Sequence, residues 1–322
     1  MSASILITGG TSGLGYHAAI NLARQFPNHQ IIIASRTNTN NASDRINRHL
    51  KQQNVSFMPL DLSSFTQVRA FVTEWTKESH PPIEYLLLNA GIQVAGPVKH
   101  TEDGFERTFA INHLSQALLF SLLTPYLTHD ARIVLTGSGT HDPSQPWPVP
   151  PAKYTSAEDL ADAKKVKDSQ ECYSNSKLIT LMWSYALERR LKPLRESGQC
   201  NWTVASICPG MVPGTNLARN LGPVVACLFR VILPRCLPLL RIAVGSKNIY
   251  TPEYSGESIA FVAGAEEVRG VSGEYFEGRA VVKSSGESYE EVKQEELWEF
   301  TVKSIARGEE EVKRFGLGEL GV

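Results

Sequence analysis

Cysteine is scarce in this sequence, and the few that occur form no pairing pattern. The 322 residues contain five cysteines, an odd number, and no two of them are spaced as Cys-x-x-Cys. A disulfide scaffold and a structural zinc site are therefore not expected, and a reducing compartment is predicted. The eight histidines include no His-Glu-x-x-His motif, so we expect no metal site.

An excess of charge of either sign is also missing. Lys plus Arg number 32 and Asp plus Glu number 33, which gives a formal net charge of -1. No nucleic-acid partner is predicted, because the whole protein offers no electrostatic attraction to a phosphate backbone. The residues before the first apolar run, at 5–7, leave no room for a leader. We therefore expect a cytoplasmic protein, with peripheral contact to an organelle membrane as an alternative.

A long uninterrupted apolar run is absent too. The most apolar stretch, residues 224–244, contains Arg230, Arg235 and Arg241 as well as two prolines. Each central Arg would cost roughly 2.5 kcal/mol or more in a bilayer, so a transmembrane span is not expected. No Asp or Glu occurs from 197 through 252, so the stretch is apolar and locally cationic. A lid or oligomer surface is favoured, and contact with a membrane surface is the alternative.

Apolar and polar segments alternate in a way that predicts an α/β fold. Hydrophobic residues make up 42% of the chain and charged residues 20%, which is typical of a globular core. Short branched runs predict buried strands, and longer amphipathic segments between them predict helices. The rhythm indicates a doubly wound parallel sheet in one domain, residues 1–315, followed by a frayed C-terminus, 316–322. Strands are predicted at 5–7, 31–34, 55–58, 85–88, 133–136 and 202–208; helices are predicted at 14–25, 43–53, 65–79, 104–126, 173–191 and, as a solvated closing helix, 291–305.

Two segments interrupt this alternation. Residues 139–171 begin with a stretch, 141–151, that contains five prolines, and residues 210–250 include the apolar cationic stretch. Both follow predicted strands at the carboxyl edge of the sheet, where ligands bind in open α/β folds. We expect both to form substrate walls or a lid.

A glycine-rich turn follows the first strand and opens the first helix. Glycines allow the backbone to approach a ligand closely, and the free N–H groups of a helix start attract a pyrophosphate. The context of strand, turn and helix favours dinucleotide binding over an ordinary tight turn. The candidate residues are Thr8, Gly9, Thr11, Ser12, Gly13, Leu14 and Gly15.

The end of the second predicted strand indicates which dinucleotide is bound. An acidic residue there would bond the ribose diol of NAD and repel the extra phosphate of NADP. The sequence instead has Ser35 and Arg36, a small hydroxyl donor and a planar guanidinium suited to a phosphate. NADP(H) is therefore predicted, with a solvent-exposed Arg36 of no special role as the alternative.

Tyr173 and Lys177 lie four residues apart and would share one face of a helix. A free tyrosine has a pKa of about 10 and is a poor acid–base group near neutrality. A nearby ammonium favours the phenolate, and a shift of about three pKa units corresponds to roughly 4 kcal/mol. We therefore predict a lowered pKa for Tyr173. A surface Tyr–Lys pair is the alternative.

The spacing Thr-Gly-x-x-x-Gly-x-Gly, the Tyr-x-x-x-Lys pair and the order of the motifs between and after them resemble the short-chain dehydrogenase/reductase family along nearly the whole chain. The resemblance implies a Rossmann-type fold and a hydride transfer between the nicotinamide and a carbonyl, an alcohol or an activated double bond. It implies that Ser138 holds the substrate oxygen, that Tyr173 is the acid–base, and that Asn112 bends its helix and holds a water linked to Lys177. The remaining cofactor contacts implied by the family are Asp61, Leu62, Asn89, Ala90, Gly91, Pro209, Gly210 and Val212, with Tyr173 and Lys177 beside the nicotinamide ribose.

Within this family, the sequence resembles the branch of retinol dehydrogenases and protochlorophyllide reductases. The resemblance rests on the segments 173–178, 214–217 and 298–299. It implies a lipophilic small-molecule substrate, and pairing into a homodimer or tetramer through the helices that carry Asn112 and Tyr173. A catalytically silent NADP-binding sensor or scaffold is the alternative, although such a protein would have no need for all four site residues.

Overall fold

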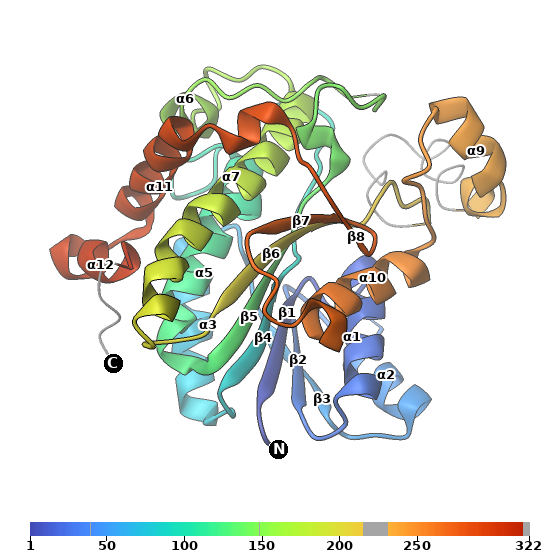
Figure 1. The fold of residues 1–322 in the computed structure, drawn as a ribbon, viewed down its shortest axis with the longest axis vertical. Coiled ribbons are helices and arrows are strands. Elements are labelled where there is room, and N and C mark those ends of the chain that lie inside the picture. The colour runs from blue at the N-terminus through green and yellow to red at the C-terminus, as the bar shows by residue number, and fades with distance from the viewer. Residues whose placement is uncertain (39, 148, 215–230, 318–322) are drawn as a thin grey trace.

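Eight strands form one twisted sheet at the centre of the molecule (Figure 1). The computed structural model describes residues 1–38, 40–147, 149–214 and 231–317. The strand order is β3-β2-β1-β4-β5-β6-β7-β8, with every neighbouring pair parallel except β7 and β8. The predicted doubly wound parallel sheet is confirmed. The strands are β1 (Ser4–Thr8), β2 (Gln30–Ser35), β3 (Val55–Pro59), β4 (Ile83–Leu88), β5 (Leu127–Thr136), β6 (Thr203–Cys208), β7 (Glu274–Glu277) and β8 (Ala280–Val282).

Helices cover both faces of the sheet, as the fold requires when strands are apolar on both sides. Three helices, α1 (Gly13–Gln25), α2 (Ala42–Leu50) and α10 (Pro252–Gly264), pack on one face. On the other face lie α3 (Phe65–Glu78), α5 (Ser115–Leu123) and α7 (Ser169–Glu196). The strands β1 to β6 thus contribute side chains to two separate cores, one on each face of the sheet.

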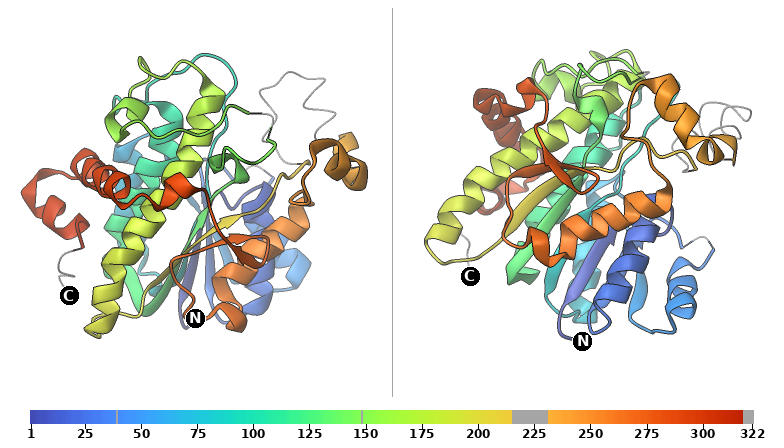
Figure 2. Two further views of the ribbon diagram at one scale, coloured as in Figure 1. Left: turned by 45° about the horizontal axis from the view of Figure 1, so that its top comes forward. Right: turned by 45° about the vertical axis from the view of Figure 1, so that its right-hand side comes forward.

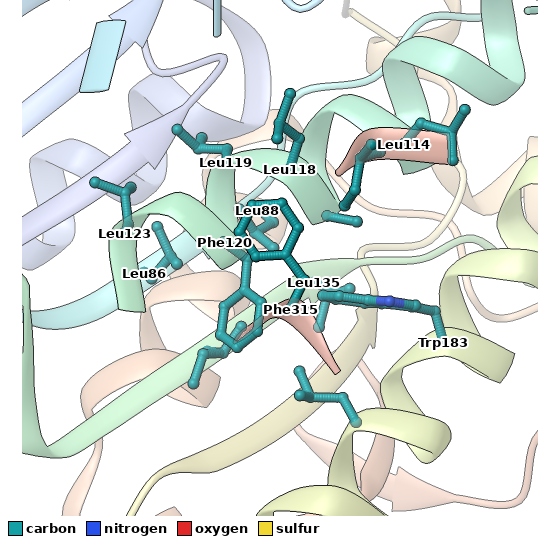
Figure 3. Packing of buried hydrophobic residues seen from close by; sticks show 14 of the residues in the cluster. Leu86, Leu88, Leu114, Leu118, Leu119, Phe120, Leu123, Leu135, Trp183 and Phe315 are labelled. Carbon is teal, nitrogen blue, oxygen red and sulfur yellow. The ribbon is translucent and has the colours of Figure 1, made fainter. Parts of the chain in front are cut away.

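The larger core lies between the sheet and α5 and α7. Leu86 and Leu88 of β4 and Leu135 of β5 meet Leu118 and Phe120 of α5 there (Figure 3). All five side chains are buried. Burying a large apolar side chain contributes roughly 1.5–3 kcal/mol, so this cluster fixes the helices that carry the site residues.

The sequence did not reveal α10, β7 or β8. The helix α10 is rich in small and polar residues, and its packing on α1 depends on Gly256. A Cβ added to Gly256 would lie 2.3 Å from the Cβ of His17. The two helix backbones therefore approach each other closely, an arrangement that leaves little hydrophobic periodicity in the sequence.

The predicted helix at 104–126 is broken. It begins as α4 (Arg107–Phe109), continues as a π-helical turn at Ala110–Leu114, and then becomes α5. A π turn is a local irregularity that is frequent at functional sites, and this one carries Asn112. The structure thus shows a helical irregularity at the residue where a bend was expected.

The C-terminal helix α11 (Glu291–Ile305) is not the solvated helix predicted from its many glutamates. Leu297, Trp298 and Ile305 are buried, and the Trp298 ring stacks on Trp183 of α7 at a centroid distance of 5.9 Å. The Arg190 guanidinium lies 4.1 Å from the centroid of the Trp298 ring. Thus α11 forms an outer layer over α5 and α7, because its charged residues occupy only one side.

The chain ends with α12 (Gly308–Phe315), which follows α11 at the outer edge (Figure 2). Phe315 and Leu317 are buried. The prediction that the chain is frayed from residue 316 is therefore wrong for Leu317, which packs against the larger core. Residues 318–322 lie outside the described residues.

The first excursion, 139–171, is largely packed. Its short helix α6 (Ala157–Ala161) lies against α11, where the Ala157 N–H donates to Glu296 at 3.2 Å and the Tyr154 hydroxyl donates to the same carboxylate. The Lys153 N–H donates to Asn175 of α7 at 2.8 Å. These contacts make the second half of the excursion a fixed wall, and α7 begins at Ser169.

Part of the second excursion, residues 215–230, lies outside the described residues. Its remainder contains α9 (Leu237–Val244), which stands apart from the sheet in all three views (Figures 1 and 2) and buries none of its residues. Met211 and Ile249 form a parallel bridge that ties the base of this excursion to the end of β6. Among the helices that the structure describes, none combines the length and the apolar character that a membrane crossing needs.

Pairing through α5 and α7 was expected from the family resemblance. Every residue of α7 from Cys172 to Leu187 is already buried within the single chain, and so is nearly all of α5. The layer formed by α11 covers the outer side of both helices. The described chain therefore leaves little of either helix exposed, and the homodimer or tetramer stays a prediction.

Candidate active site

The glycine turn forms a narrow backbone cradle between β1 and α1. Gly9 and Gly13 have φ of 70° and 54°, values that side-chain-bearing residues rarely adopt. A Cβ on Gly15 would lie 2.5 Å from the Gly9 carbonyl oxygen and 2.6 Å from Asn89 Nδ2. A cradle of this kind fits a dinucleotide pyrophosphate, because the glycines carry no side chains that would keep a ligand away from the backbone.

The start of α1 is open to an anion. Ser12 is the N-cap residue, yet its side chain makes no capping hydrogen bond, and no acidic residue stands in the first turn. The first N–H groups of an uncapped helix have no partner within the helix and carry a partial positive charge. Thr11, Ser12 and Leu14 surround this end and are all at least partly accessible. They are therefore placed as the dinucleotide prediction requires.

Thr8 supports the turn from behind. It is fully buried, and its hydroxyl accepts hydrogen bonds from the N–H groups of Asn89 and Ala90, each at 2.9 Å. The Asn89 side chain donates to the Thr8 carbonyl at 2.8 Å and accepts from Thr136 at 3.2 Å. Thr8 and Asn89 thus lock the ends of β1, β4 and β5 together. The buried Thr8 hydroxyl is thus engaged within the protein, and the predicted cofactor contact at Thr8 stays a prediction for its backbone.

Ser35 is the last residue of β2, and Arg36 follows it. Ser35 is half-buried and Arg36 is exposed, and among the described residues Arg36 is paired with no carboxylate. At the end of β3, Asp61 Oδ1 accepts from the Ser63 N–H at 2.9 Å, and Leu62 is buried. These four residues lie at the carboxyl ends of neighbouring strands, where the adenosine half of a dinucleotide would be held.

Asn112, Gly91 and Lys177 converge at the end of β4. Asn112 Oδ1 accepts from the Ile92 N–H at 2.7 Å, and its Nδ2 donates to the Ile92 carbonyl at 3.0 Å and to Ser176 at 3.0 Å. A Cβ on Gly91 would lie 3.3 Å from Asn112 Oδ1 and 3.6 Å from Lys177 Nζ. The amide of Asn112 therefore fixes the loop after β4 against the helix that carries Lys177.

Tyr173 and Lys177 occupy one face of α7, as predicted. Both are buried, and Lys177 Nζ lies 5.7 Å from the centroid of the Tyr173 ring. Lys177 Nζ donates to the Thr136 carbonyl at the end of β5 at 2.8 Å. The side chain of Ser138 lies close enough to the Tyr173 hydroxyl to act on the pKa of that hydroxyl. The structure thus brings Ser138, Tyr173 and Lys177 together at the carboxyl edge of the sheet.

The predicted lowering of the Tyr173 pKa does not hold for the protein by itself. Burial raises the pKa of Tyr173 to about 12, and the side chain of Ser138 offsets this only in part. Burial also lowers the pKa of Lys177 to about 8. Desolvation disfavours the charged form of each group, and it is the largest cause of both shifts.

The turn after β6 is held by the far end of the second excursion. Gly210 has φ of 80°, and a Cβ there would lie 2.7 Å from Asn248 Oδ1. The Pro209 carbonyl accepts from Ser255 of α10 at 2.7 Å, and Val212 is buried. The backbone at Pro209 and Gly210 is therefore fixed where the nicotinamide end of a dinucleotide would lie.

Comparison with known proteins places this arrangement among oxidoreductases. The short chain dehydrogenase family model matches residues 3–156. Polyprenol dehydrogenase of Danio rerio is 30% identical over 91% of this chain and 83% of its own length. Retinol dehydrogenase 14 of Homo sapiens is 31% identical over 85% of this chain and 77% of its own length. The chain belongs to the short-chain dehydrogenase/reductase family.

Solved structures share the fold. A protein from Mycobacterium paratuberculosis superposes with a TM-score of 0.67 at 24% identity, covering 94% of this chain and 93% of its own. A short chain dehydrogenase from Burkholderia cenocepacia in complex with NADP gives a TM-score of 0.60 at 20% identity, covering 85% and 95%. Members of the family bind nicotinamide cofactors, and the glycine cradle of this short-chain dehydrogenase fits one.

Two residues beside Ser138 were missed in the sequence. Thr140 donates to Ser138 Oγ from its N–H at 3.3 Å and from its hydroxyl at 3.2 Å. His141 is buried and its Nδ1 lies 2.7 Å from the Ser138 carbonyl oxygen. A third, Trp147, covers the same loop, because a Cβ on Gly139 would lie 2.6 Å from Trp147 Nε1. For Thr140 and His141, the position directly after Ser138 was the available signal.

Proposed function

We propose that this short-chain dehydrogenase is an NADP(H)-dependent oxidoreductase that acts on a carbonyl, an alcohol or an activated double bond of a lipophilic small molecule. The observation that carries the proposal is the convergence of Ser138, Tyr173 and Lys177, backed by Asn112, beside a glycine cradle at one edge of the sheet. A binding-only protein would gain nothing from burying a lysine and a tyrosine next to each other, since burial of each ionised form is costly.

The chemistry needs a hydride and a proton delivered to opposite ends of a carbonyl group. Bound NADPH would supply the hydride. Ser138 donates its hydroxyl proton in a hydrogen bond that orients the carbonyl oxygen, and Tyr173 transfers its phenolic proton to that oxygen. With a pKa of about 12, Tyr173 is protonated at neutral pH and so is ready to donate.

Lys177 stabilises the phenolate that remains after proton transfer. This role requires the ammonium form, and burial lowers the pKa of Lys177 to about 8. The rate of carbonyl reduction should therefore be constant below pH 8 and fall as the pH rises through that value. A rate profile that stays flat to pH 10 would exclude Lys177 as the stabilising cation.

The preference for NADP(H) over NAD(H) is proposed from Arg36. Its exposed guanidinium follows β2, and among the described residues no carboxylate neutralises it. A planar guanidinium binds a phosphate through two parallel hydrogen bonds, whereas no acidic side chain follows the strand to bond a free ribose diol.

The proposed lipophilic substrate is supported by the surface around α9. Val231, Ile232, Leu239 and Ile242 are exposed, with Ile242 at 79%. Arg235 and Lys247 on the same segment are exposed as well. An apolar face with cations and no carboxylates is complementary to an anionic lipid surface. We propose that this segment, next to the turn after β6, contacts such a surface and lets the substrate enter from it.

The decisive experiment is a panel of lipophilic ketones and aldehydes assayed by loss of NADPH absorbance. Tyr173→Phe should reduce turnover by about a thousandfold or more, because it removes the only proton donor in the proposed step, while NADPH affinity stays within about twofold. Turnover within tenfold of the parent would exclude Tyr173 as the acid. NADPH binding without turnover of any substrate would favour the sensor or scaffold.

The membrane contact is tested separately. The double variant Leu239→Ser, Ile242→Ser should lose co-sedimentation with vesicles that contain anionic lipid, whereas Val292→Ser should not. Val292 is equally exposed but lies on α11, far from the cationic segment. Equal vesicle binding by the parent protein, the double variant and Val292→Ser would exclude α9 as the contact.

A further inference from the structure

A buried histidine connects the loop after β5 to the C-terminal part of the chain. His141 has a relative exposure of 2% and lies three residues after Ser138. Its Nδ1 is 2.7 Å from the Ser138 carbonyl oxygen, and its Nε2 is 3.1 Å from the backbone nitrogen of Ser285. His141 thus joins Ser138 to Ser285, which lies more than a hundred positions further along the sequence.

The two partners fix the protonation state of the ring. A carbonyl oxygen can only accept a hydrogen bond, so Nδ1 of His141 must carry the hydrogen. The backbone N–H of Ser285 can only donate, so Nε2 must offer its lone pair. Only the neutral ring with hydrogen on Nδ1 satisfies both bonds, because a protonated imidazole has two donors and no acceptor.

The surroundings of the ring favour the same neutral state. The ring packs edge-on against Tyr275 of β7 at a centroid distance of 5.0 Å, and Tyr275 is itself buried. The charged group that acts on the ring is Asp142 in the same loop, and the Tyr275 hydroxyl donates to Glu277 at 3.4 Å. Burial lowers the pKa of His141, and this effect exceeds the opposing influence of Asp142 and of the Ser138 carbonyl.

We propose that His141 is a positioning residue for Ser138: a neutral imidazole that ties the loop after β5 to Ser285, so that the C-terminal segment sets where the Ser138 hydroxyl points. The bond to the Ser138 carbonyl fixes the peptide plane between Ser138 and Gly139. The same loop carries Thr140, whose two hydrogen bonds hold Ser138 Oγ. The inference rests on the proposed function, because Ser138 matters only if it holds a substrate oxygen.

Three substitutions at His141 separate its two hydrogen bonds. His141→Asn places an amide N–H near Nδ1 and keeps the donor to Ser138. His141→Gln places an amide oxygen near Nε2 and keeps only the acceptor for Ser285. His141→Phe keeps the packing on Tyr275 and removes both bonds. We expect His141→Phe and His141→Gln to lower kcat about ten- to a hundredfold and His141→Asn, which loses only the bond to Ser285, several-fold, with the KM for NADPH unchanged in all three.

The far end of the connection offers a second pair of variants. Ser285 has φ of -61°, a value that proline adopts. Ser285→Pro therefore removes the N–H with little backbone change, and Ser285→Ala is the matched control that keeps it. We expect a several-fold loss of kcat for Ser285→Pro and none for Ser285→Ala. Equal kcat for these two variants would overturn the connection, even if a His141 variant failed to fold.

A double-mutant cycle distinguishes positioning from general support of the fold. If His141 acts through Ser138, the combination of His141→Phe with Ser138→Ala should be no slower than Ser138→Ala alone. Multiplying effects, or a rise in the KM for NADPH that matches the fall in kcat, would contradict the proposal.

One measurement does not depend on turnover. The ring ¹⁵N chemical shifts of His141 should show hydrogen on Nδ1 and no titration near the ordinary pKa of 6.5. A ring that titrates there, or carries hydrogen on Nε2, would overturn the proposal. If these shifts agree but no substrate is turned over, it is the proposed function that fails, and the connection between His141 and Ser285 stands.

Discussion

The glycine cradle and the wall beside Tyr173 are built in opposite ways. In the cradle, Gly9, Gly13 and Gly15 follow one another within a single turn, and a short local pattern specifies the shape. In the wall, the contacts join distant residues: Tyr154 with Glu296 and His141 with Ser285. Next to it, His113 of the π turn is bonded to Thr301 of α11 in the same way. The cofactor half of the site is therefore encoded locally, whereas the substrate half depends on how the end of the chain packs back onto the middle.

This difference predicts which function each kind of mutation should affect. A change in the cradle should weaken cofactor binding with less effect on the rest of the fold. A change in the outer layer of α11 should lower the stability of the fold and leave the affinity of the folded protein for NADPH intact. The predictions below test this separation in order of decreasing effect.

Trp298→Ala should cost about 3–5 kcal/mol of unfolding free energy, the usual range for removing a buried tryptophan. Trp298 is 4% exposed, stacks on Trp183 and lies under Arg190. Denaturant titration measures the loss. The control Val292→Ala, on the same helix at 85% exposure, should change stability by less than about 0.5 kcal/mol. NADPH affinity should be unchanged in both variants. A large loss of NADPH affinity in Trp298→Ala would contradict the separation between cradle and outer layer.

Gly15→Ala should weaken NADPH binding about a hundredfold or more. Its Cβ would lie 2.5 Å from the Gly9 carbonyl oxygen, which belongs to the cradle backbone and cannot move without changing the site. Fluorescence titration with NADPH measures the affinity. Gly286→Ala is the control, because a Cβ there has no heavy atom within 4 Å. Similar affinities for the two variants would show that the cradle does not hold the dinucleotide.

Arg36→Asp should weaken NADPH binding by about 2–3 kcal/mol and leave NADH binding equal or stronger. A charge-assisted hydrogen bond is worth about 1.5–3 kcal/mol, and a carboxylate adds repulsion toward a phosphate. The ratio of kcat/KM for the two cofactors measures the change. An unaltered ratio would refute the assignment of NADP(H).

Acid should destabilise the outer layer through His113. Burial lowers the pKa of His113 to about 3, so the folded protein keeps this ring neutral while the unfolded chain binds a proton below pH 6.5. Stability is therefore lost as the pH falls from 6.5 toward 3, by about 2 kcal/mol between pH 6.5 and 5.

His113→Gln is the matched variant, because its amide nitrogen can still donate to Thr301, as Nε2 of His113 does at 2.7 Å. Thr301 donates its own proton to the Leu297 carbonyl, so the histidine nitrogen must be the donor. The variant should lose stability less steeply with acid. His141, which is also buried and neutral, keeps part of the slope in both proteins. An unchanged slope would exclude His113 as a source of the acid sensitivity.

The sequence predicted the first six strands and most of the helices on which the site rests, because a strand buried on both faces is a continuous branched run. It also identified Tyr173 and Lys177, since a spacing of four residues on a helix is a local property. It could not reveal that burial raises the pKa of Tyr173 to about 12 instead of lowering it. That outcome depends on how completely the surrounding elements exclude water.

The burial of α11 likewise lay beyond the sequence. Its glutamates indicated a solvated helix, yet Leu297, Trp298 and Ile305 form a stripe that fills the outer side of α7. Whether a narrow apolar stripe is buried depends on the presence of a partner surface, and that surface comes from residues far away in the chain. For the same reason, the sequence could not show that α11 packs over α5 and α7, the helices through which pairing was expected.

By itself, the sequence determined the parallel sheet, the dinucleotide cradle and the family, because each follows from patterns a few residues long. Tertiary structure alone decided that Thr8 supports the turn from inside, that His141 joins Ser138 to Ser285, and that α11 covers the helices of the site. The physical reason is that desolvation and hydrogen-bond partners are properties of the packed molecule, set by segments that meet only after folding.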